Sequence, residues 1–255
     1  MYKLYKMKSN GNQVGCCVKY ECKINENEIG IFKLPINTLS RDHICESVAY
    51  KVAKVFGIEF CWSGVKNIDG NIGAFSRYEI DDKSKLVTLS SLTGVNNMIV
   101  DEYLSVMKRL LYKRDFEYCV QSLAIDFILG QRDRHFDNIS VYKSSDKRHK
   151  RKELWCLYKM YDNGFCLASN TIPEHAVDEL KYLDYSGRMG SGIDVLAELK
   201  KYRKYLKCFK RKEITLDTFT TIIRESDRYN QINEVLLKMM ANAAYKRYEL
   251  LVKNI

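Results

Sequence analysis

The stretch LGQRDRHFDN, residues 129–138, decides how this sequence is interpreted, because it joins an apolar run to a strand-like segment. The apolar run, FEYCVQSLAIDFIL (116–129), has helical periodicity and predicts a central buried helix. The strand-like segment that follows is ISVYK (139–143). The polar residues between them therefore lie on a loop that two rigid elements hold in place.

A second polar loop, YDNG (161–164), follows another strand-like segment, residues 154–161. If the two strands pair as a hairpin, both loops lie at the same end of it. That arrangement brings Asp133, Asn138 and Asp162 close together.

These three side chains suit metal-assisted phosphoryl transfer. Mg²⁺ prefers hard oxygen ligands and keeps several waters, so one carboxylate and one amide oxygen are enough protein ligands. A further carboxylate must stay off the metal to accept or orient the attacking hydroxyl. The protein-kinase catalytic loop has an Asn five residues after its catalytic Asp, and a metal-binding Asp-x-Gly beyond. Asp133 and Asn138 have this spacing and Asp162-Asn163-Gly164 follows, which favours a kinase-type site over two Asx-rich turns.

The first part of the chain contributes a lysine and a glutamate. In the strand-like run 29–34, alternation places Lys33 on the same face as two isoleucines, where its ammonium favours an anionic partner such as a nucleotide phosphate. The helix predicted over 44–56 carries Glu46. An ion pair between Lys33 and Glu46 would hold the lysine over the phosphates. The alternative is a lysine stem at a sheet edge and a glutamate favoured by the helix dipole.

Residues 9–15 precede the first clear strand, which is predicted over 14–24. Gly11 and Gly15 could let backbone N–H groups approach phosphates. The pattern is neither GxGxxG nor a Walker A, and an ordinary turn fits it equally well.

The chain divides into a β-rich part and a helical part. Asp69-Gly70 predicts a hairpin turn between strands 62–68 and 72–80. The order strand, strand, helix, strand, strand, followed mainly by helices, predicts an α+β fold with a small N-lobe (1–82) and a larger, mainly helical C-lobe (83–255). The helices predicted in the C-lobe span 101–113, 116–129, 193–206, 215–225 and 230–252.

Composition limits the class of protein. Of the 255 residues 46% are hydrophobic and 29% are charged, which excludes a disordered or fibrous chain. Nine cysteines at irregular spacing, with no CxxC, predict a reduced, cytoplasmic protein without a zinc site, and no window predicts a membrane span. The net charge of +10 fits polyanionic partners. The basic run 147–152 predicts a solvated loop. The sequence contains no nucleic-acid-binding motif.

The run GQRDRHFDN (130–138), followed by Tyr161-Asp162, resembles the catalytic core of HipA-like serine/threonine protein kinases, in particular their short CtkA-type members. Its Asp-Arg-His-x-x-Asn core also resembles the phosphatidylinositol 3/4-kinase catalytic loop. The resemblance implies a two-lobed protein-kinase-like fold that binds ATP and Mg²⁺ between the lobes and phosphorylates protein serine or threonine.

Carried over to this sequence, the resemblance implies a role for each matching residue. Asp133 would be the catalytic base, with His135 a structural or phosphate-side residue of the same loop. The implied magnesium ligands are Asn138 and Asp162. The implied phosphate-binding residues are Ser9, Asn10, Gly11, Gly15 and Lys33, with Glu46 as the partner of Lys33, and the adenine would lie near Arg77, Tyr78, Glu79 and Ile80.

The resemblance also bears on regulation and partners. Asp-Asn-Gly replaces Asp-Phe-Gly in the metal loop, so a hydrophobic active/inactive switch is not implied there. Expected partners are ATP, a protein substrate that includes the kinase itself, and an antitoxin-like or host protein. A lipid kinase and a non-catalytic nucleotide-binding module are the alternatives.

Overall fold

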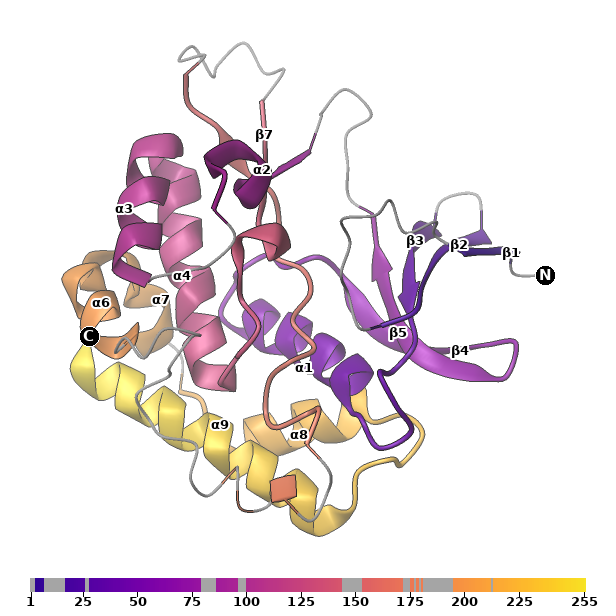
Figure 1. Cartoon of the computed structure of the whole chain (residues 1–255). Helices are drawn as coiled ribbons and strands as arrows, with labels where there is room; N and C mark the ends of the chain where they lie inside the picture. Colours follow the sequence, from indigo (N-terminus) through magenta and orange to yellow (C-terminus); the bar gives the residue numbers. More distant parts are fainter. Residues whose placement is uncertain are drawn as a thin grey trace.

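The computed structural model of this chain describes residues 3–6, 17–25, 28–78, 86–95, 100–143, 153–171, 175–176, 178, 180, 195–211 and 213–255. Figure 1 shows a β-sheet on one side of the molecule, most of the helices on the other, and the helix α1 between them.

The larger sheet is antiparallel, with strand order β1-β2-β3-β5-β4. At the predicted hairpin Asp69 and Gly70 both have positive φ, 52° and 84°, as a tight turn between twisted strands requires. The strand bounds are Lys3–Lys6 (β1), Lys19–Asn25 (β2), Glu28–Lys33 (β3), Ser63–Ile68 (β4) and Asn71–Arg77 (β5).

Strand alternation gives this sheet two different faces. One face buries a small apolar cluster of Cys22, Phe32, Ile68 and Phe75. Lys33 lies on the other face, as predicted, because it follows Phe32 along β3.

Helix α1 (Asp42–Val55) links the sheet to the helical part of the chain. It packs against β4 and β5 on one side and against α4 and α8 on the other. Its buried face, which includes Ile44 and Val48, belongs to the same apolar core as the C-terminal helices. Gly57, with a φ of 76°, follows the helix end, as the sequence predicted.

The rest of the described chain is mainly helical. It also contains a three-stranded antiparallel sheet in the order β6-β7-β8, which confirms that the segments around 140 and 156 pair. The bounds are Val87–Thr88 (β6), Leu89–Thr93 (α2), Val100–Leu110 (α3), Lys113–Leu129 (α4), Phe136–Asn138 (η1), Ser140–Tyr142 (β7), Cys156–Leu157 (β8), Val195–Lys201 (α6), Arg203–Tyr205 (η2), Lys207–Lys210 (α7), Leu216–Ser226 (α8) and Glu234–Asn254 (α9).

Several predicted elements have different bounds in the structure, three of them in the helical part of the chain as follows. The strand predicted over 154–161 is only two residues long, and these two residues pair with Tyr142 and Val141 of β7. The helix predicted over 193–206 ends at Lys201. The helix predicted from 230 begins at Glu234, because Asn233 caps it: its side-chain oxygen accepts a 2.8 Å hydrogen bond from Leu236 N.

Among the described residues, none of the helices is long and apolar enough to cross a membrane. The predicted lobe boundary at 82/83 falls outside the described residues and stays a prediction.

Candidate active site

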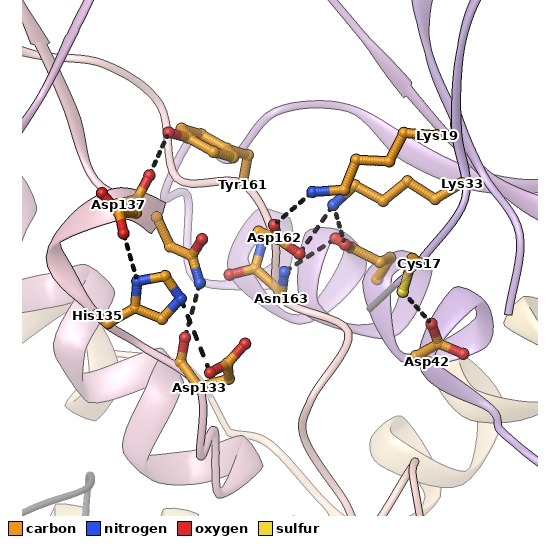
Figure 2. A network of polar contacts seen from close by, with 12 residues as sticks. Cys17, Lys19, Lys33, Asp42, Asp133, His135, Asp137, Tyr161, Asp162 and Asn163 are labelled. Atoms are coloured by element: carbon orange, nitrogen blue, oxygen red, sulfur yellow. Dashed lines mark hydrogen bonds and ion pairs between the residues drawn. The ribbon is translucent and has the colours of Figure 1, made fainter. Parts of the chain in front are cut away.

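Lys33 is the centre of a buried ion-pair cluster that joins the sheet, α1 and the loop after β8. Its ammonium lies 3.0 Å from Glu46 Oε1 and 2.9 Å from Asp162 Oδ1. The predicted pair of Lys33 and Glu46 is therefore present, and Asp162 completes it as a third member. Figure 2 shows the side chain of Lys33 directed at Asp162.

The backbone of the metal loop fixes the direction of Asp162. Asp162 has a φ of 57°, a left-handed conformation that Asp tolerates better than most residues. The next residue, Asn163, donates its backbone N–H to Glu46 Oε2 at 3.0 Å. Glu46 therefore uses one carboxylate oxygen for Lys33 and the other to hold the loop that carries Asp162.

The charges in this cluster stabilise one another. Burial by itself would raise the pKa of Asp162, but the positive charges of Lys33 and Lys19 outweigh it and hold that pKa well below its usual range. Burial would lower the pKa of Lys33, but Asp162 and Glu46 raise it above its usual value. Asp162 is therefore ionised at neutral pH, as a metal ligand must be.

Gln131 connects the catalytic loop to the metal loop. Its side-chain oxygen accepts hydrogen bonds from the backbone N–H groups of Arg132 (2.9 Å) and Asp133 (3.2 Å). Its side-chain nitrogen donates to the carbonyl oxygen of Asp162 at 3.3 Å. A single buried side chain thus sets the backbone of both candidate catalytic aspartates.

Arg134 makes a second and stronger connection between the two loops. Its guanidinium is buried and forms a two-pronged ion pair with Asp126 of α4, both contacts being 2.9 Å. It also donates to the carbonyl oxygen of Tyr161 at 2.9 Å and to Asn163 Oδ1. The residues on either side of Asp162 are therefore tied to the residue that follows Asp133.

A hydrogen bond to the catalytic loop orients the side chain of Asn138. Its side-chain nitrogen donates to the backbone oxygen of Asp133 at 2.7 Å, so its oxygen is the end that can bind a metal. In the described part of the chain no group of three or more His, Cys, Asp and Glu residues forms a metal site. The donor set of one carboxylate, from Asp162, and one amide oxygen fits Mg²⁺, which retains several waters.

Asp133 is a partly exposed member of this network. Its side chain is 47% exposed, and His135 Nε2 is 3.8 Å from its Oδ1, while His135 Nδ1 is 3.8 Å from Asp137 Oδ2. Burial raises the pKa of Asp133, and the nearby charge of Asp162 adds to the rise. A carboxylate with a raised pKa accepts a proton more readily, which suits a general base.

Two of the four residues predicted to lie near the adenine, Arg77 and Tyr78, are among the described residues. Arg77 pairs with Gly30, which is three residues from Lys33 along β3, so alternation puts its side chain on the face opposite to that of Lys33, over the Trp62 ring at 4.8 Å. Tyr78 continues from β5 and donates its backbone N–H to Ile29 O at 2.9 Å. The remaining predicted nucleotide-binding residues lie outside the described residues: Ser9, Asn10, Gly11, Gly15, Glu79 and Ile80.

The sequence interpretation missed several residues of this network. Lys19 lies 3.6 Å from Asp162, and Cys17 donates its thiol to Asp42 at 3.5 Å. Burial, together with Asp42, raises the pKa of Cys17 to about 12, so this thiol stays protonated. Asp126 carried the one available sequence signal, because it is an acidic residue within the apolar run 116–129.

No protein-family model matches this sequence, and no characterised protein matches it at the sequence level. Solved structures do match its fold. The crystal structure of the Helicobacter pylori proinflammatory kinase CtkA superposes with a TM-score of 0.73 at 15% identity, covering 99% of this chain and 95% of that one.

Two further structures are similar in part. The Golgi casein kinase matches with a TM-score of 0.53 at 11% identity, over 98% of this chain and 72% of that chain. HipA of Shewanella oneidensis MR-1, solved with HipB and its operator DNA, matches with a TM-score of 0.49 at 10% identity, over 98% of this chain and 67% of that chain. The chain therefore shares the α+β fold of the CtkA kinase structure, as its sequence predicted.

Proposed function

We propose that this protein is a Mg²⁺-dependent kinase that transfers the γ-phosphate of ATP to a serine or threonine hydroxyl of a protein. The observation that carries the proposal is the convergence of Lys33, Glu46 and Asp162, next to a catalytic loop whose Asp133 and Asn138 are hydrogen-bonded to each other. These are the parts of a phosphoryl-transfer site, in which positioning and electrostatic stabilisation supply most of the catalysis.

Each residue has a role that its contacts support. Lys33, held by Glu46, binds the nucleotide phosphates. Asp162 and Asn138 hold magnesium, which when bound offsets the negative charge of the transferring phosphoryl group. Asp133 orients the substrate hydroxyl and takes up its proton.

The experiment is phosphate transfer from γ-labelled ATP with Mg²⁺, onto the protein itself, a generic basic protein and phosphoinositide vesicles. We expect label on protein, and a loss of about 100-fold or more in Asp133→Asn. Asp217→Asn, an exposed carboxylate on α8, is the matched control and should transfer at the wild-type rate.

Two outcomes contradict the proposal. Label on the vesicles alone would make the protein a lipid kinase. Wild-type transfer by Asp133→Asn would exclude Asp133 as the base. The cytoplasmic location and an antitoxin-like or host partner stay predictions from the sequence.

A further inference from the structure

Lys19 is a second lysine that reaches the candidate active site, and it comes from a different strand. It lies directly opposite Lys33 in the pairing of β2 with β3, so both side chains project from the same face of the sheet. Its ammonium lies 3.6 Å from Asp162 Oδ2, while that of Lys33 lies 2.9 Å from Asp162 Oδ1. Figure 2 shows the two lysines directed side by side at the same carboxylate.

Two like charges directly opposite each other destabilise a strand pair unless an anion lies between them. Lys33 has two carboxylates, Glu46 and Asp162. Within the described residues, the ion pair of Lys19 is with Asp162. That carboxylate is also the candidate metal ligand, so a bound cation would compete with Lys19 for it.

The position of Lys19 relates it to the transferred phosphate. Its ammonium is paired with Asp162, the candidate metal ligand. The terminal phosphate must lie between the metal ligand and the base for in-line transfer. An ammonium paired with the metal ligand is therefore at one edge of that position.

We infer that Lys19 is a second phosphate-binding lysine, which exchanges its ion pair with Asp162 for the β- and γ-phosphates when nucleotide and metal bind. The inference rests on the proposed function. It gives the site two lysines for the triphosphate, one fixed by Glu46 and one released from Asp162 by the cation. Lys19 thereby links metal binding to phosphate binding.

The test compares the wild type with Lys19→Met in two experiments. Calorimetric titration measures the affinity for ATP·Mg²⁺ and for adenosine. Electron paramagnetic resonance measures the affinity for Mn²⁺ in the absence of nucleotide. A hydrogen bond to a charged group corresponds to about 10- to 150-fold in affinity, so we expect ATP binding to weaken by that factor in Lys19→Met. Adenosine binding stays unchanged, because the nucleoside has no phosphate. Mn²⁺ binds more tightly, because Lys19 no longer competes for Asp162.

Two further variants serve as controls. Lys23→Met removes a lysine from the same face of β2, four residues or roughly 13 Å away, and should change none of these affinities. Lys19→Arg keeps the charge and should retain most of the ATP affinity, which separates loss of charge from loss of folding.

Two results overturn the inference while the wild type still binds ATP. One is unchanged ATP affinity in Lys19→Met, and the other is an equal loss for ATP and adenosine, which would make the role structural. If the wild-type protein binds adenosine but gains nothing from the phosphates and Mg²⁺, the proposed function itself fails. The two failures are therefore distinguishable.

Discussion

Arg134→Met is the substitution whose effect follows most directly from the structure. The variant removes four hydrogen bonds of a buried guanidinium, two of them to Asp126. It leaves the carboxylate of Asp126, which is 4% exposed, without its cation. Removing one partner of a buried ion pair costs about 3–5 kcal/mol of unfolding free energy. For a chain of this size that corresponds to a fall in Tm of about 6–20 °C.

The double variant Asp126→Leu/Arg134→Met separates the charge from the positioning. Replacing both partners of a buried pair by apolar groups is often close to neutral, so we expect the double variant to regain most of the lost stability. Phosphate transfer should stay low, because the loop carbonyl of Tyr161 and the side chain of Asn163 still lack their donor. Stability and activity would then respond differently to the same pair of changes.

Urea unfolding of the wild type, both single variants and the double variant provides the measurement. Arg224→Met is the matched control, because Arg224 forms a 2.8 Å ion pair with Glu234 in which both side chains are 56% exposed. We expect that control to lose at most about 1 kcal/mol. The reasoning is refuted if Arg134→Met costs no more than the control, or if the two single costs simply add in the double variant.

Three further predictions concern the parts that position Lys33, Asp162 and α1. Gly73→Ala would place a methyl group 2.3 Å from the carbonyl oxygen of Lys33, so it should lower Tm and weaken ATP binding. Gly64→Ala, whose added methyl group meets only the side chain of Trp62, should have smaller effects. Equal effects of the two variants would argue against the contact. The two lysines keep the pKa of Asp162 low in the native protein, whereas the unfolded chain takes up a proton at this residue near pH 3.9. The free energy of unfolding should therefore fall as the pH drops below about 5. In urea titrations Asp162→Asn should show a smaller fall, and an identical pH profile would contradict the ion pairs. The guanidinium of Arg41 donates to the carbonyl oxygens of residues 168 and 171 at 3.0 and 2.6 Å. Arg41→Met should therefore speed hydrogen exchange of the backbone amides in the first turn of α1. Unchanged exchange would mean that other contacts hold the helix.

The sequence predicted those parts of the site that depend on local patterns. The spacing of Asp133 and Asn138 and the Asp-x-Gly after a strand identified both loops, and alternation gave the correct face for Lys33. The pairing of β7 with β8, on which the meeting of the loops depended, is also present. These features follow from residue spacing within short segments, so they are accessible without long-range information.

Features that depend on long-range pairing were missed. Lys19 joins the site because β2 pairs with β3 in one particular register. The strand predicted over 14–24 begins at Lys19, because β3 ends at Lys33, the residue opposite. The pair of Asp126 and Arg134 crosses from a helix to a loop that folds back on it. The face on which the Arg77 side chain lies likewise depends on the register of β5 with β3.

The central claim is that Asp162 and Asn138 hold the magnesium of a phosphoryl-transfer site. The measurement that tests it most directly is the Mg²⁺ dependence of single-turnover γ-phosphate transfer in the wild type, Asp162→Asn and Asn138→Leu. The account predicts that each variant needs more Mg²⁺ for half-maximal transfer and is at least about 100-fold slower at saturation, since the charge stabilisation of the transferring group is lost. Wild-type rates with an unchanged Mg²⁺ requirement in either variant would contradict it.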